Sequence, residues 1–423
     1  MLPGDERRRS DCGGDCEIEL NAATSISDAS AGKRKPAKKH SPLFLAVFPV
    51  FLIATIITVA GVLIGVLAAK PSHHDTQWFW ASGNLLAHGN NPYDREALRQ
   101  IELSLGLPLK NQVMMTLNPP STFFLLAPLG LLTPREGVFA WSLLLAAFLI
   151  LSVQAIRAMV DHPDERGYVL LAWFFPPALC CIEVGQTGLI TLLGLALFLR
   201  FHESRPWWAG AALSLCAVKP HLLLPFGVVL LAWIVARKRW AVLSGAILAL
   251  VVESLIAMAL DHSIWTHYRA MMRTERFADE FIPTLGVGLR FLIDRQAMWL
   301  EFVPAALGCV WGLWYFWRNR QKWDWRTHGS LLTLVSLAVA PYAWLTDQVL
   351  AIPAILFALL GAKKPRKGSV TVLMAILSLT AIQMMTTKSL FFKPDMLLGV
   401  VWVAWYLYAT SSPELAKEAL AAA

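Results

Sequence analysis

One acidic residue, Asp75, lies just beyond the first long apolar run of the chain, residues 43–69. His74 precedes it, and the aromatic residues Trp78 and Phe79 follow it. A carboxylate at the boundary between membrane and water could act as a general base and remove the proton of an acceptor hydroxyl. Partial burial against the aromatic residues would raise its pKa toward a useful value. The alternative is a solvated carboxylate in a surface loop.

Lys219 could supply a positive charge to the same site. It follows an apolar run and precedes Pro220 and His221. Charged side chains within membrane segments are costly and usually functional, so a lysine at a proline break could neutralise the phosphate of a lipid. His221 could assist as a hydrogen-bond donor. The alternative is a lysine at the end of a span that extends its ammonium group to the water.

Further polar residues interrupt apolar runs and could contact a sugar or a phosphate. Gln186 lies in the segment 185–188, where two glycines allow a close approach to the backbone. Asp347 could bind sugar hydroxyls or pair with Lys219, and Arg290 could hold a phosphate with two parallel hydrogen bonds. The other candidates for sugar or acceptor binding are Asn118, Tyr342 and His74.

Two of these positions also have a simple structural explanation. The segment 185–188 could be a plain turn, and Asn118 precedes prolines that commonly start a helix. Common cofactor motifs do not occur: the sequence has no Walker loop, no glycine-rich dinucleotide fingerprint and no His-Glu-x-x-His. Cys12 and Cys16 have no second Cys or His pair at a metal-binding spacing. We therefore predict no cofactor and no metal.

Membrane helices must position these residues, because the composition is that of a polytopic membrane protein. Hydrophobic residues make up 56% of the chain and charged residues 16%, whereas soluble domains contain roughly 25% charged residues. The mean hydropathy is +0.53, and the apolar residues form long runs. The sequence predicts an all-α polytopic protein with about 11–13 transmembrane or re-entrant helices.

Lysines and arginines cluster in short segments between the apolar runs, so the net charge of +8 indicates topology and not nucleic-acid binding. The positive-inside rule places these clusters in the cytoplasm. They are residues 33–39, 200–205, 237–239, 318–326 and 363–367. We expect a multi-pass protein of the plasma (inner) membrane with a cytoplasmic N-terminus and with most candidate residues on the non-cytoplasmic face.

Three regions follow from this topology. Residues 1–40 form a basic cytoplasmic tail that we expect to be disordered, residues 41–411 form the transmembrane domain, and residues 412–423 form a second cytoplasmic tail. A large outer loop, 70–118, should carry a short amphipathic helix on the membrane surface. The short apolar run 119–132 either crosses the membrane or dips into it and returns.

Several motifs occur in a fixed order along the chain. They are Asp75 after the first run, Gly-Asn-Asn-Pro-Tyr (89–93), Asn-Pro-Pro (118–120), Gly-Gln-Thr-Gly-Leu-Ile (185–190), Val-Lys-Pro-His (218–221) and Pro-Tyr-Ala-Trp-Leu-Thr-Asp-Gln (341–348). Together, over roughly residues 43–410, they resemble glycosyltransferase family 87, polytopic enzymes of the C superfamily. The resemblance implies the fold of that superfamily.

The resemblance also implies a reaction. The expected enzyme is an inverting hexosyltransferase that moves a sugar, typically mannose, from a polyprenyl-phosphate donor to a lipid or glycan acceptor. It implies that Asp75 is the general base, while Lys219 would stabilise the departing phosphate. The expected partners are this donor, the acceptor and membrane lipids. One departure concerns Asp347, because mannosyltransferase relatives often carry His in that segment.

Two alternatives belong to other functional classes. A transporter or flippase of lipid-linked saccharides often contains internal repeats, and the two halves of this sequence show no convincing repeat. A polysaccharide ligase or polymerase would place its major outer loop late in the chain, whereas the large loop here is residues 70–118.

Overall fold

The computed structural model describes residues 41–68, 75–106, 115–161, 166–274, 281–361, 364–387 and 393–411. Every regular element within these ranges is helical, which confirms the predicted all-α fold. All of them lie in one compact unit, Pro42–Ala423. His74 and the predicted tails 1–40 and 412–423 lie outside the described residues.

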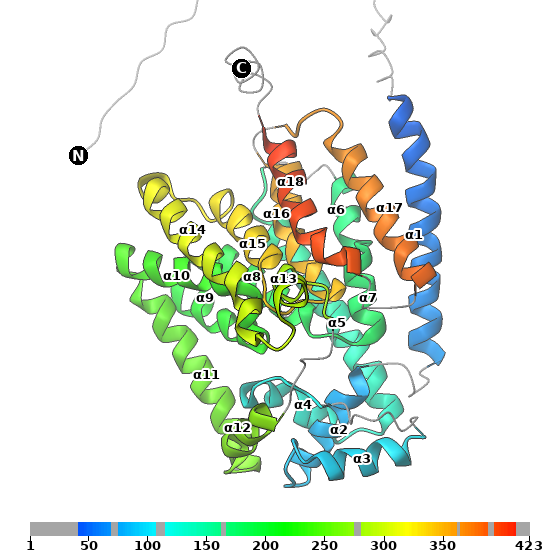
Figure 1. Cartoon of the computed structure of the whole chain (residues 1–423), viewed down its shortest axis with the longest axis vertical. Helices are drawn as coiled ribbons and strands as arrows, with labels where there is room; N and C mark the ends of the chain where they lie inside the picture. Colours follow the sequence, from blue (N-terminus) through cyan, green and yellow to red (C-terminus); the bar gives the residue numbers. More distant parts are fainter. Residues whose placement is uncertain are drawn as a thin grey trace, which may run out of the picture. The chain divides into compact units, whose positions relative to one another are not determined.

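Among the described residues, eleven α-helices precede residue 261 (Figure 1). They are α1 (Pro42–Ala68), α2 (Thr76–Ala87), α3 (Arg95–Ser104), α4 (Phe123–Leu129), α5 (Pro134–Arg157), α6 (Arg166–Trp173), α7 (Pro176–Val184), α8 (Gly188–Phe201), α9 (Pro206–Leu213), α10 (Leu224–Arg237) and α11 (Trp240–Leu260). They are followed by α12 (Ile264–Thr274), α13 (Leu285–Ile293), α14 (Val303–Asn319), α15 (His328–Ala338), α16 (Ile352–Leu360), α17 (Ser369–Thr387) and α18 (Leu398–Thr410).

Short 3₁₀ turns extend or connect these helices. They are η2 (Pro120–Thr122), η3 (Ser214–Val218), η4 (Pro220–Leu223), η5 (Met298–Phe302), η6 (Arg320–Lys322), η7 (Leu345–Ala351) and η8 (Lys393–Leu397). Several of them interrupt apolar helices, as the polar breaks in the sequence predict.

Seven helical segments in the described part of the chain are long and apolar enough to cross a membrane. They are Pro42–Leu67, Pro134–Arg157, Gly167–Val184, Pro220–Arg237, Trp240–Leu260, Met298–Lys322 and Ser369–Thr386. The shorter apolar helices are Pro120–Leu129, Gly188–Phe201, Pro206–Val218, His328–Ala338 and Leu345–Leu360. Together the two groups agree with the predicted polytopic arrangement of crossing and partial helices.

The helices sort into a lipid-facing periphery and a packed centre. α1 exposes apolar residues along its length, including Ile53, Ile56 and Ile64, so this face suits contact with lipid. At the centre, every residue of α8 from Gly188 to Ala196 is buried. α8 packs against α5, α9 and η7, so the break that precedes it lies inside the bundle.

The two ends of the bundle differ in their elements. In Figure 1, α1 starts and α18 ends at the top of the view, and α17 also starts there. The short helices α2, α3, α4 and α12 gather at the bottom. The basic segments 33–39 and 363–367 immediately precede α1 and α17. The predicted outer-loop helices therefore lie at the end opposite to these helix starts.

One prediction about the outer loop needs correction. The helix expected on the membrane surface is present as α2, but nine of its twelve residues are buried, and it packs against α4 and α5. Glycines bring the backbones together, since a Cβ on Gly83 would lie 2.0 Å from the carbonyl oxygen of Leu126. The exposed amphipathic helix of this loop is α3, which buries Leu98 alone.

The ambiguous run 119–132 forms a short helical piece. η2 and α4 together cover Pro120–Leu129, ten residues, or about 15 Å of helix. Since the hydrocarbon core is about 30 Å thick, this piece is too short to cross alone. It packs against α2 and α11 instead.

Candidate functional site

Four polar side chains from distant parts of the sequence form one continuous network, called here the polar cluster. The Nε2 of Gln186 donates a hydrogen bond to the carboxylate of Asp75. The Nζ of Lys219 donates to Oε1 of Gln186 at 3.0 Å and to Oδ1 of Asp347 at 2.7 Å. The side chains of Lys219 and Asp347 are 8% and 0% exposed. The structure thus brings together four of the residues predicted from the sequence.

Each member of the polar cluster lies where a helix begins or ends. Asp75 directly precedes α2, and Gln186 lies between α7 and α8. Lys219 separates η3 from η4, and Asp347 belongs to the first turn of η7. Irregular backbone at membrane depth is tolerated only where protein or an aqueous cavity surrounds it. The breaks converge inside the protein, and this convergence marks a candidate site more strongly than any single motif does.

A left-handed turn at Gly185 places Gln186 next to Asp75. Gly185 has φ +80°, and a Cβ there would lie 1.8 Å from Oγ1 of Thr76. The carbonyl oxygen of Gly185 accepts a hydrogen bond from Nε1 of Trp141 at 2.7 Å. The backbone N–H of Asp75 donates to the carbonyl oxygen of Val184 at 2.8 Å. Only glycine combines this conformation with this close approach.

Asn118 supports the backbone beside Lys219. Its Nδ2 donates to the carbonyl oxygen of Val218 at 3.0 Å, and its Oδ1 accepts from Oγ1 of Thr116 at 3.0 Å. The hydroxyl of Tyr93 donates to the Asn118 carbonyl oxygen at 2.9 Å. Burial raises the pKa of the Tyr93 phenol well above its ordinary value, so this hydroxyl stays a neutral donor. The outer loop is thereby fastened to the residue that precedes Lys219.

Aromatic residues hold the other side of the polar cluster. Oδ2 of Asp347 accepts a hydrogen bond from the backbone N–H of Trp344 at 2.9 Å. Nε1 of Trp344 donates to the hydroxyl of Tyr342 at 2.8 Å, and the Tyr342 ring meets the His221 ring edge-on at 5.4 Å between centroids. Tyr342 and His221 therefore lie next to the polar cluster. The sequence reasoning missed Trp344, although it lies within a motif that was singled out.

Several buried polar atoms near the polar cluster have no hydrogen-bond partner within the described part of the chain. They are Nε2 of Gln77, Oγ1 of Thr187, Nε2 of His221, Oγ1 of Thr346 and Oε1 of Gln348. Each belongs to a residue within two positions of a cluster member. Buried polar groups are normally satisfied by protein, water or a ligand. Both donors and acceptors are present, which suits a ligand rich in hydroxyl groups.

Arg290 has its partners in another region. It is fully buried, its Nε lies 2.5 Å from Oε1 of Glu301, and its NH1 donates to the carbonyl oxygen of Arg295 at 2.6 Å. The hydroxyl of Thr284, just before α13, donates to the carbonyl oxygen of Pro341 at 3.2 Å. Through this hydrogen bond, the segment that carries Arg290 contacts the segment that carries Asp347.

No group of three or more His, Cys, Asp or Glu in the described residues could hold a metal ion. The polar cluster comprises the ammonium group of Lys219, the carboxylates of Asp75 and Asp347, and the amide of Gln186, which bridges Asp75 and Lys219. This arrangement can accept a proton at Asp75 and hold an anion at Lys219.

Comparison with known proteins gives one match. The family model described as Glycosyltransferase family 87 matches residues 117–341, which is more than half of the 423 residues. The matched range contains Asn118, Gln186 and Lys219, whereas Asp75 precedes it and Asp347 follows it. No curated protein and no solved structure matches the chain.

Proposed function

The chain belongs to glycosyltransferase family 87, and from this membership we propose that it moves a hexose, with mannose the first choice, from a polyprenyl-phosphate donor to a hydroxyl of a lipid or glycan acceptor. It is a multi-pass membrane glycosyltransferase. The proposed reaction inverts the anomeric centre and takes place on the non-cytoplasmic face of the plasma (inner) membrane. Family membership favours a transferase over a transporter or flippase.

The observation that carries this proposal is the polar cluster. It holds a candidate base, Asp75, and a candidate phosphate ligand, Lys219, on the two ends of a single carboxamide, that of Gln186. An inverting displacement needs a base for the incoming hydroxyl and a positive group for the departing phosphate. One bridging side chain fixes the positions of both groups relative to each other.

The step follows from these roles. Asp75 removes the proton of the acceptor hydroxyl while the acceptor oxygen bonds to the anomeric carbon. The bond between that carbon and the phosphate oxygen breaks, and its electron pair leaves with the lipid phosphate. Lys219 stabilises the charge that develops on the phosphate. Asp347, at 2.7 Å from the ammonium group, keeps Lys219 oriented.

Two further observations support the substrate class and the membrane face. The polar atoms without partners next to the polar cluster offer hydrogen bonds to sugar hydroxyls. The outer-loop helices α2, α3 and α4 lie at the end of the bundle opposite to the start of α1 (Figure 1), whose preceding segment 33–39 is strongly basic. Under the positive-inside rule this end faces away from the cytoplasm.

The test is transfer of radiolabel from polyprenyl-phosphate-mannose to a membrane lipid extract by the purified protein in nanodiscs. Asp75→Asn should reduce transfer by about 10²–10⁴-fold while donor binding persists. Glu96→Gln is the matched control, because Glu96 is an exposed acid on α3 of the same loop, and it should transfer like the wild type. Wild-type turnover by Asp75→Asn would exclude Asp75 as the base.

A wild type that leaves the donor intact would mean that the sugar or the acceptor is a different one, or that the protein is a transporter. The same assay with other polyprenyl-phosphate hexoses then separates a wrong sugar from a wrong donor class. Loss of transfer by both Asp75→Asn and Glu96→Gln would indicate damage to the loop and would count against a specific role of Asp75.

A further inference from the structure

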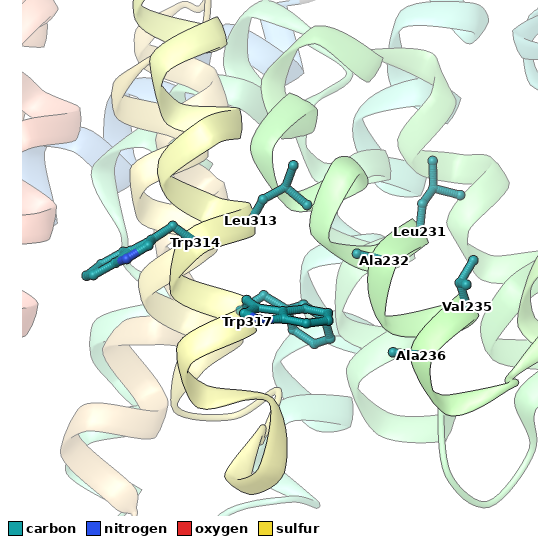
Figure 2. Close-up of a pocket in the computed structure, with 8 residues that line it drawn as sticks. Leu231, Ala232, Val235, Ala236, Leu313, Trp314 and Trp317 are labelled. Carbon is teal, nitrogen blue, oxygen red and sulfur yellow. The ribbon is translucent and has the colours of Figure 1, made fainter.

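An apolar groove runs between the second halves of α10 and α14, at the end of α10 that is far from Lys219 in sequence (Figure 2). Its volume is about 810 Å³, and all its lining residues are aliphatic or aromatic. Leu231 and Val235 on α10 line one side of it, and Leu313 and Trp317 extend from α14 toward α10 (Figure 2). The volume lies within the roughly 300–1,000 Å³ of small-ligand sites.

Two arginines lie beside one end of this groove. The guanidinium group of Arg320 lies over the ring of Trp317 at 4.4 Å, and its NH1 donates to the Trp317 carbonyl oxygen at 2.9 Å. NH2 of Arg237 donates to the carbonyl oxygen of Arg320 at 2.7 Å, so the ends of the two helices are tied together. Both arginines are exposed and retain further N–H donors.

The positive charge at this end is not neutralised by nearby acids. Among the described residues, none of Arg237, Lys238, Arg318 and Arg320 forms an ion pair with a carboxylate. The acid of this region, Asp324, is exposed, and its carboxylate accepts the backbone N–H of Thr327 at 2.9 Å. The groove is therefore apolar along its length and has, at one end, positive charges that form no ion pair with a carboxylate of the described residues.

Both membrane spans that form the groove end at these arginines. The spans are Pro220–Arg237 and Met298–Lys322, so their basic ends lie at the level of lipid headgroups. Cations next to a span attract anionic lipids, and arginine matches phosphate oxygens with its planar donors. Arg320 stacked on Trp317 and Arg237 at the end of α10 offer such donors directly above the apolar channel.

We propose that the groove binds an anionic phospholipid, with an acyl chain between α10 and α14 and with the headgroup phosphate on Arg237 and Arg320. This site is separate from the proposed catalytic one, since Lys219 precedes α10 and Arg237 ends it. A donor phosphate on Lys219 and a phospholipid phosphate on Arg237 would occupy opposite ends of the same helix.

The experiment is native mass spectrometry of the purified full-length protein with phosphatidylglycerol or phosphatidylcholine of identical acyl chains. The wild type should retain phosphatidylglycerol preferentially. Arg237→Gln combined with Arg320→Gln should weaken that binding by roughly thirtyfold, on about 1 kcal/mol for each cation. Arg205→Gln is the matched control, because Arg205 is an exposed arginine stacked at 5.8 Å on Phe201, which does not line the groove, whereas Arg320 stacks on the lining residue Trp317.

A second variant keeps the test valid if the double arginine variant unfolds. Ala236→Trp places a large ring in the groove from an exposed position and leaves both cations in place, so it should also reduce retention of phosphatidylglycerol. Equal retention of the two lipids by the wild type, or unchanged retention by Ala236→Trp, would overturn the proposal. Displacement of phosphatidylglycerol by polyprenyl phosphate would overturn it too, in favour of the donor lipid.

Discussion

Two buried ion pairs of this protein are alike in burial and charge and differ in what surrounds them. Asp347 of the Lys219–Asp347 pair and Arg290 of the Arg290–Glu301 pair are both 0% exposed in their side chains. The first pair joins residues 128 positions apart. The second joins α13 to the end of η5, within a short stretch of chain. Burial and charge alone do not distinguish the two.

The neighbours of each pair explain the difference. Lys219 extends the first pair to Gln186 and through it to Asp75, so a long-range pair assembles a polar site. Arg290 adds to the second pair a hydrogen bond to the carbonyl oxygen of Arg295 and a stacking contact with the ring of Phe291 at 4.8 Å. Gly286 packs so closely on this turn that a Cβ would lie 2.2 Å from the carbonyl oxygen of Glu301. The local pair thus stabilises a turn.

Among the variants that test this comparison, Lys219→Met should have the largest effect. Loss of the ammonium group should reduce transfer by about 10²–10³-fold, and the unpaired Asp347 should lower the free energy of unfolding by about 3–5 kcal/mol. The double variant Lys219→Met/Asp347→Leu should regain stability, since an apolar pair replaces a buried ion pair well. It should not regain transfer. Thermal unfolding in detergent measures the stability, and the radiolabel assay measures the transfer. Full transfer by the double variant would contradict the proposed role of Lys219.

A single and a double variant of the Arg290–Glu301 pair should change the stability of the protein without changing its transfer activity. Arg290→Met should destabilise the protein by about 3–5 kcal/mol, because Glu301 loses its partner in a buried turn. Arg290→Met/Glu301→Leu should restore stability and transfer at the wild-type rate per folded molecule. A folded double variant without transfer would instead support the role in phosphate binding that the sequence predicts for Arg290.

The turn at Gly185 offers a sharper test of how the polar cluster is built. Gly185→Ala should lower the free energy of unfolding by about 1–3 kcal/mol, because φ is +80° and Thr76 leaves no room for a Cβ. Transfer should fall as well, since this turn positions both Asp75 and Gln186. Gly227→Ala in α10 is the control: a Cβ there meets nothing within 4 Å, so stability should rise by about 0.5–1 kcal/mol. Equal stability of both variants would contradict this account.

Sequence reasoning reached the parts of this site that depend on local signals. Polar breaks in apolar runs are local, and they located Gln186, Lys219 and Asp347 correctly at helix ends. The partners of each side chain depend on how distant breaks align, which no spacing reveals. For this reason the bridge through Gln186 and the local partner of Arg290 had to come from the structure. The burial of α2 (TQWFWASGNLLA) was missed because an amphipathic sequence does not reveal whether lipid or other helices cover its apolar side chains.

The smallest effect should come from Asn118, which the sequence assigns to sugar or acceptor binding and which contacts the backbone beside Lys219. Asn118→Ala removes the donor to the Val218 carbonyl oxygen and should cost about 1 kcal/mol of stability. Transfer should fall by no more than about tenfold, which corresponds to 1.4 kcal/mol, because Lys219 keeps its charge and shifts only slightly. Tyr93→Phe is the matched control, since it removes a single hydrogen bond to the Asn118 carbonyl oxygen. If Asn118 contacts the sugar itself, Asn118→Ala should instead raise the KM for the donor strongly at unchanged stability, and Tyr93→Phe should leave that KM alone.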